Sequence, residues 1–213
     1  MVIGASLIYS IPAHDFSFAK TSGRVTGEIN PGNKNAEIFD GYYPLKLAWE
    51  NFSPTECNAS DDLGDIDEIL KNCTYTVGTN WTSMWTVKLS EGYYGFTPEG
   101  FHNNNDYDDV GPWQVSFERS VEGDLDKNGK DDAVVILRLN YGGSGSWLNM
   151  IILIQLGDGY YEQTANYMFE DREVIRGLSV DNGIITVRII VKDDNDSYCC
   201  PSVYDTYRFR ITD

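Results

Sequence analysis

One short segment, GDLDKNGKDDAVV at residues 123–135, carries oxygen-bearing side chains at alternate positions. These side chains are Asp124, Asp126, Asn128 and Asp132, at positions 1, 3, 5 and 9 of the loop. Gly129 at position 6 permits a sharp turn, and Lys130 at position 7 would offer its backbone carbonyl oxygen. A hard cation takes about six to eight oxygen ligands, so this spacing predicts a calcium site.

The segment is only partly like an EF-hand loop. Position 12, where an EF-hand has a bidentate glutamate, is Val135 in this chain. Because the residues after the loop are strand-forming, the segment is similar to calcium turns that lead straight into a β-strand, as in integrin-type β-propeller repeats. The chain holds a single copy, which does not predict a propeller.

The loop is acidic, since four aspartates less two lysines between 124 and 132 give a local charge of −2. These carboxylates would repel one another without a cation. A polar turn that binds no ion is the alternative interpretation. Two other acidic runs, at 106–109 and 193–196, lack the spacing and are expected to be solvated loops, although either could donate a carboxylate or hold a second ion.

The sequence offers few residues in the patterns that catalysis requires. The chain has two histidines, His14 and His102, and Ser144 and Ser146 stand in a glycine-rich hairpin without the GxSxG pattern. Paired carboxylates could act in a glycosidase, but 33 acidic residues make chance proximity common. We therefore do not predict an enzyme, and a hydrolase with an acidic or metal-assisted site stays an alternative.

Tryptophan side chains offer a different chemistry, because aromatic faces can stack on sugar rings. The candidates for such a platform are Trp81, Trp85, Trp113 and Trp147. Tryptophan in strands is more often part of the core. A carbohydrate or a protein is the kind of ligand that exposed aromatic loops would bind.

The chain is strongly acidic, with 16 basic and 33 acidic residues and a net charge of −17. This charge argues against nucleic acid or an anionic membrane surface as a partner. No stretch reaches the roughly 18 apolar residues of a transmembrane segment. A length of 213 residues with 41% hydrophobic and 13% aromatic residues favours an ordered, strand-rich domain.

Four cysteines without CxxC spacing or nearby histidine favour disulfides and an oxidising compartment. We therefore expect an extracellular, cell-surface or periplasmic location. Cys57 and Cys73 bracket a short acidic segment, and their pairing is favoured. Cys199 and Cys200 are adjacent, so they form either a vicinal disulfide or two separate bridges.

Eight runs rich in β-branched or aromatic residues predict strands, at 73–79, 83–89, 113–119, 133–140, 147–155, 159–168, 183–191 and 203–211. Turn residues at 142–146, 157–159 and 181–183 predict hairpins. The last strand should bury Tyr207, Phe209 and Ile211 on one face. The predicted fold is mostly β, an antiparallel sandwich or barrel-like meander, with one short helix at Asp61–Asn72.

The N-terminal part has a different character. Residues 1–13 are apolar and predict either a first strand or the remnant of a secretory signal. Residues 20–41 are rich in turn formers and read as a linker. We therefore divide the chain into residues 1–41, an N-terminal strand or signal remnant plus linker, and 42–213, a single β-rich domain.

Several motifs occur in a fixed order from 72 to 211: NCTY, VKLSEGYY, EGDLDKNGKDDAVVIL, YGGSGSW, EDREVIRGLSVDNGIITV and DNDSYCCPS. Through them the chain resembles a family of exported and lipid-anchored bacterial proteins of uncharacterised function. The resemblance assigns the acidic loop to Asp124, Asp126, Asn128 and Asp132. Relatives of this type usually read Leu-Gly-Asp-Arg where this chain has Phe169, Glu170, Asp171 and Arg172.

The resemblance implies an envelope or extracellular address and supports the calcium loop, but it implies no substrate. It also favours a disulfide between Cys199 and Cys200 themselves, a ring that would be structural or redox-active.

Together these observations predict a calcium-stabilised extracellular or periplasmic binding module whose ligand is unknown. The alternative from another class is a structural or assembly subunit of the cell surface, which would self-assemble by pairing the N-terminal strand with a neighbour's sheet edge.

Overall fold

The strands of this chain form because runs of β-branched and aromatic residues alternate with glycine- and asparagine-containing turns. The computed structural model describes residues 57, 65–78, 84–95, 113–157, 160–197 and 199–211. Its elements are α1 (Ile66–Leu70), β1 (Thr74–Gly78), β2 (Met84–Lys88), β3 (Tyr93–Gly95), β4 (Gln114–Gly123), β5 (Asp132–Asn140), β6 (Trp147–Gly157), β7 (Tyr160–Met168), β8 (Val174–Asp181), β9 (Ile184–Val191) and β10 (Val203–Arg210). The predicted segment 1–41 lies outside the described residues.

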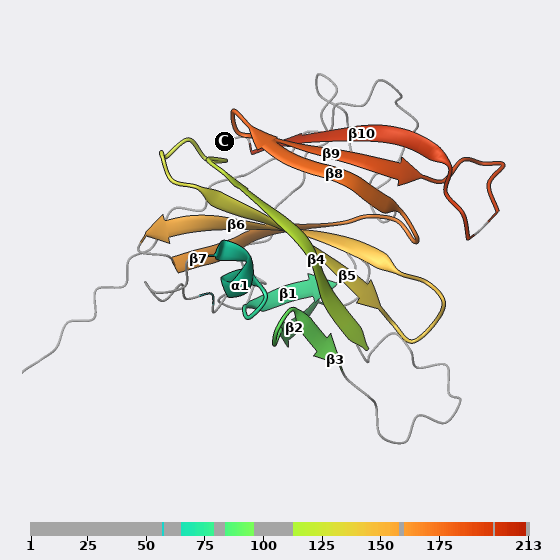
Figure 1. The fold of residues 1–213 in the computed structure, drawn as a ribbon, viewed down its shortest axis with the longest axis horizontal. Coiled ribbons are helices and arrows are strands. Elements are labelled where there is room, and N and C mark those ends of the chain that lie inside the picture. Colours follow the sequence, from blue (N-terminus) through green and yellow to red (C-terminus); the bar gives the residue numbers. More distant parts are fainter. Residues whose placement is uncertain are drawn as a thin grey trace, which may run out of the picture.

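Three antiparallel sheets make up the fold. The central sheet has the order β3-β4-β5-β6-β7, and two smaller sheets have the orders β10-β9-β8 and β1-β2. In Figure 1 the β8–β10 sheet lies above the central strands, whereas α1 and the β1–β2 ribbon lie below them. The prediction of a mostly antiparallel β fold is confirmed; the described strands form layered sheets and no closed barrel.

The two central strands are buried on both faces. Val134 and Ile136 of β5 face a core shared with the β8–β10 sheet, while Val135 and Leu137 face a second core with α1 and β1. All four side chains are fully buried. Alternate residues of a strand point to opposite faces, so covering both faces requires an uninterrupted apolar run such as AVVIL.

The C-terminal strand closes the upper core. Tyr207 and Phe209 are buried, and Ile211 packs against the same cluster. Their ring contacts include Tyr167–Phe209 at a centroid distance of 5.2 Å. The predicted alternation along this strand is therefore confirmed.

Helix α1 is shorter than the predicted Asp61–Asn72. It begins after Asp65, whose carboxylate accepts the backbone N–H of Asp67 at 3.0 Å, and it ends at Leu70. Residues 61–64 lie outside the described part. The helix buries Ile69 and Leu70, and Cys73 just beyond it is bonded to Cys57, as the cysteine spacing predicts.

The β1–β2 ribbon is hydrogen-bonded to the central sheet mainly through the side-chain amide of Gln163, with a longer bond of 3.4 Å from the Asn166 amide to the Thr76 carbonyl oxygen. Gln163 of β7 accepts the backbone N–H of Thr76 at 2.9 Å and donates to the Thr76 carbonyl oxygen at 2.8 Å. Both residues are buried. The carboxamide thus satisfies both backbone groups of Thr76 as a neighbouring strand would.

All three predicted hairpins are confirmed, but the strand prediction omitted β3 and β8. β8 contains Arg176, Gly177 and Ser179, which weaken the strand signal, and β3 has only three residues. The β8–β9 turn has positive φ at Asn182 (52°) and Gly183 (74°), the geometry that two-residue hairpins favour.

Gln163→Leu should lower the free energy of unfolding by about 2 kcal/mol, because it leaves the buried N–H and C=O of Thr76 without their main partner. Urea denaturation measures the change. Gln114→Leu is the matched control, since Gln114 is exposed on β4, and it should change stability by less than about 0.5 kcal/mol. Equal effects of the two variants would contradict the role given to Gln163.

Candidate metal site

The acidic loop connects β4 to β5 at one end of the central sheet. β4 approaches β8 closely just before it, since a Cβ on Gly123 would lie 2.5 Å from Val180 Cγ1. Lys127 and Gly129 then adopt positive φ values of 64° and 84°. Two left-handed residues in three reverse the chain tightly, which folds the polar side chains back over the loop.

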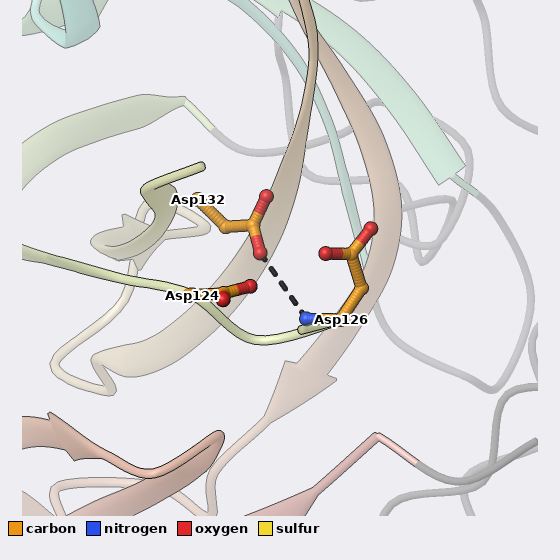
Figure 2. A group of neighbouring side chains, drawn as sticks. All are labelled: Asp124, Asp126 and Asp132. Atoms are coloured by element: carbon orange, nitrogen blue, oxygen red, sulfur yellow. Dashed lines mark hydrogen bonds between the residues drawn. The ribbon is translucent and has the colours of Figure 1, made fainter. Parts of the chain in front are cut away.

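Three carboxylates meet inside this loop. One oxygen from each of Asp124, Asp126 and Asp132 lies within 4.8 Å of the others. Figure 2 shows the three side chains gathered at the loop. The structure therefore brings together three of the five residues predicted to hold calcium.

Asp132 is the most deeply placed of the three, with an exposed fraction of 0%. One carboxylate oxygen accepts the N–H of Leu125 at 2.7 Å and that of Asp126 at 3.4 Å (Figure 2). The other accepts the N–H of Gln155 on β6 at 2.9 Å. Asp132 thus ties the start of the loop to the neighbouring strand, and the oxygen that accepts only the Gln155 N–H keeps lone-pair capacity for a cation.

The remaining loop residues bond mainly to one another. The Asp126 carboxylate accepts hydrogen bonds from the backbone N–H and the side-chain NH2 group of Asn128. The side-chain oxygen of Asn128, Oδ1, accepts the backbone N–H of Lys130 at 2.8 Å. Asp124 accepts the N–H of Gly129 at 3.0 Å through Oδ2. These bonds tie the side chains of positions 1, 3 and 5 to the backbone and side chains of the same loop.

Oδ1 of Asp124 is different, because it is buried and has no hydrogen-bond partner within the described part of the chain. An unpaired carboxylate oxygen shielded from water is costly. A cation bound between the three aspartates would remove that cost.

The pKa values of two carboxyl groups, one in the loop and one just before it, are also consistent with a cation site. Burial raises the pKa of Asp132, the N–H groups of Gln155 and Leu125 lower it, and the neighbouring Asp126 carboxylate raises it again. Burial and the carboxylate of Asp131 likewise raise the pKa of Glu122 on β4. The protein surroundings therefore disfavour the ionised form of these carboxyl groups. A bound cation would favour the ionised form again.

Lys130 contributes no side-chain ligand. Its ammonium group reaches the Leu156 carbonyl oxygen at 3.4 Å at the end of β6. The prediction that the Lys130 carbonyl oxygen is a ligand stays a prediction.

Sequence reasoning missed two neighbours of the loop. Gln155 binds Asp132, and the turn at Gly183 passes so close that a Cβ there would lie 3.3 Å from the Leu125 carbonyl oxygen. The Asn-Gly pair signalled a turn, but no local signal indicates which loop that turn meets. The site therefore joins the central sheet to the β8–β10 sheet.

The second acidic run serves a different purpose. The Asp196 carboxylate accepts the backbone N–H groups of Asp193 and Ser202, both at 2.9 Å, and the Ser202 hydroxyl at 2.7 Å. These bonds close the loop between β9 and β10. The run at 106–109 and both histidines, His14 and His102, lie outside the described residues.

The aromatic candidates lie elsewhere. Trp85, Trp113 and Trp147 are half-buried, and Trp81 lies outside the described residues. Tyr141 contacts Trp85 and Trp147 edge-on, at centroid distances of 5.9 and 5.3 Å. These rings gather around the β5–β6 hairpin, at the end of β5 opposite the acidic loop.

That hairpin is held in place by the β7–β8 connection. Asp171 accepts the N–H of Ser146 at 2.8 Å, and the Arg172 guanidinium donates to the Ser144 hydroxyl at 2.9 Å. Ser144 and Ser146 of this hairpin therefore both take part in structural bonds.

Comparison with models of known families, with curated proteins and with solved structures found no match. The resemblance to exported bacterial proteins consequently stays a prediction. Among the described residues, no helix has the length and apolar character needed to span a bilayer.

Asp132→Asn should lower the free energy of unfolding by about 2 kcal/mol in the presence of EDTA, because its amide would turn an N–H toward a backbone donor. Thermal or urea unfolding measures the loss. Asp131→Asn changes the exposed neighbouring carboxylate and should cost less than about 0.5 kcal/mol. A neutral Asp132→Asn variant would contradict the structural role of this carboxylate.

Ser202→Ala should raise the pKa of Asp196 toward its ordinary value. The N–H of Asp193 and then the Ser202 hydroxyl are the main causes of its lowered pKa. The hydrogen bonds to the ionised Asp196 carboxylate stabilise the fold at pH values above its ordinary pKa of about 3.8. This stabilisation is lost as the pH falls through the lowered pKa. Carboxyl NMR titration tests this, with Ser197→Ala as the control that should leave the pKa unchanged.

Proposed function

We propose that this protein is a calcium-stabilised binding module of the extracellular or periplasmic space. The observation that carries the proposal is the meeting of three aspartate carboxylates within 4.8 Å in a tight loop. Oxygen-only ligands on a loop with the spacing 1, 3, 5, 9 are the donor set that calcium prefers.

The donor set can be assigned to named atoms. Asp124 would supply its unpartnered Oδ1, Asp126 and Asn128 would supply side-chain oxygens, and Lys130 its backbone carbonyl. Asp132 would bind directly while keeping its bonds to the backbone. Water molecules would fill the remaining positions, since calcium takes about six to eight oxygen ligands and accepts water among them.

The ion would act on stability and not on chemistry. The loop contacts β6 through Gln155 and the β8–β9 turn through Gly183, so the ion would hold two sheets at one junction. Removing it would leave partly buried carboxylates in mutual repulsion.

The binding part of the proposal rests on the opposite end of β5. The half-buried rings of Trp85, Tyr141 and Trp147 gather there, and the β5–β6 hairpin beside them is held by Asp171 and Arg172. Half-buried aromatic rings on a rigid support suit a carbohydrate or protein ligand. The exported location is supported by the buried disulfide Cys57–Cys73.

Calcium should raise the melting temperature of the protein relative to EDTA. At free calcium 100 times Kd the native state gains ~2.7 kcal/mol, or about 5–10 °C for a chain of this size. Asp124→Ala and Asp126→Ala should each abolish the shift, while Lys130→Ala should retain it because position 7 acts through its backbone.

Differential scanning fluorimetry in EDTA and in millimolar calcium measures all four proteins. The melting temperatures in EDTA control for damage to the fold by the substitutions. An absence of any calcium shift in the wild type would reduce the loop to a polar turn and remove the metal from the proposal.

A further inference from the structure

The loop between β9 and β10 carries a disulfide between adjacent residues, Cys199 and Cys200. Both cysteines are exposed. In the other disulfide, Cys57 and Cys73 are each only 1% exposed and stand 16 residues apart in the chain. The two bonds therefore differ in both accessibility and the length of chain that they close.

The exposed bond contributes little to holding the fold together. A cross-link between neighbours encloses no other residue, so it removes little conformational entropy from the unfolded chain. The loop is closed instead by Asp196, which accepts two backbone N–H groups and the hydroxyl of Ser202. Its shape does not require the sulfur–sulfur bond.

We propose that Cys199–Cys200 is a surface thiol–disulfide exchange site that neutral or cationic dithiols reduce in the folded protein. Exposed disulfides are the ones open to thiolate attack, whereas buried ones are shielded. This proposal is independent of calcium binding, because it concerns a different loop at the other end of the β8–β10 sheet (Figure 1).

The reaction balances without a further reagent. One thiolate of a dithiol attacks either sulfur, the bond between Cys199 and Cys200 breaks, and the other cysteine leaves as a thiolate. The second thiol of the reagent then displaces the protein sulfur from the mixed disulfide. The dithiol gives up two electrons and two protons and becomes a disulfide, and the protein gains two thiols.

The charge around the site determines which reductants it accepts. Residues 192–205 contain four aspartates and one lysine, so one less four gives a net charge of −3. An attacking thiol that carries its own negative group is repelled, and a cationic one is attracted. The effect should weaken with salt, because Lys192 and Asp194 are exposed and the other three aspartates are only partly buried.

The test is native-state reduction with dithiothreitol, quenched by N-ethylmaleimide and followed by peptide mass mapping. Cys199 and Cys200 should be alkylated at least ~10-fold faster than Cys57 and Cys73, which serve as an internal control. Alkylation of all four at one rate, or only after unfolding in urea, would overturn the proposal.

Two double variants test whether the Cys199–Cys200 disulfide is an exchange site or a bond that stabilises the fold. Cys199→Ser with Cys200→Ser should block fast alkylation and leave the melting temperature within about 2 °C, whereas Cys57→Ser with Cys73→Ser should lower it by more. A large loss of stability in the first variant would make the exposed bond structural and defeat the inference.

The charge preference has its own readout. Two monothiols isolate the first attack, which forms the mixed disulfide and releases one cysteine thiolate. At low salt, cysteamine should make this attack several-fold faster than 2-mercaptoethanesulfonate of matched thiolate concentration, and the ratio of the two rates should fall at high salt. Asp194→Asn should bring the ratio of the cysteamine rate to the 2-mercaptoethanesulfonate rate closer to one at low salt. Equal rates for the two reagents at low salt would refute the role of the acidic loop.

Discussion

The structure depends on burying both faces of its two central strands. β5 and β6 present apolar side chains on each face, so one covering layer would leave half of them in water. The β8–β10 sheet covers one face, and α1 with the β1–β2 ribbon covers the other (Figure 1). The ribbon needs its own attachment because a two-stranded hairpin is marginally stable alone. The side-chain amides of Gln163 and Asn166 on β7 supply that attachment, because both bond the backbone of Thr76.

The acidic loop is a consequence of this arrangement. β5 is buried from its first residue, and that residue is Asp132. A carboxylate at the edge of an apolar layer must find donors, and three backbone N–H groups provide them. The same constraint crowds Asp124 and Asp126 beside it. Under the proposed function, a cation would balance the carboxylates that the backbone donors cannot neutralise and would thereby stabilise the junction of the two sheets.

The two ends of β5 carry different kinds of side chain. At one end, the acidic loop meets the β8–β9 turn and joins two sheets. At the other, the β5–β6 hairpin carries the aromatic contacts of Tyr141. The Cys199–Cys200 loop also stands away from the acidic loop (Figure 1). A stabilising ion at one end would leave the other free to vary its loops, as rigid scaffolds with variable loops commonly do.

Local sequence determined the strands, the hairpins and the acidic loop, because period-two patterning, Asn-Gly turns and oxygen spacing act within a few residues. It also indicated the Cys57–Cys73 pair. Local sequence did not predict β8, because Gly177 and the polar residues of this strand weaken the alternating pattern. The strand is stabilised by its pairing with β9. Only the tertiary structure decided that the sheets form three layers, that Gln163 binds Thr76, and that Gln155 and Gly183 meet the loop. These contacts join residues far apart in the chain, and their energies come from burial and backbone pairing that no local pattern specifies.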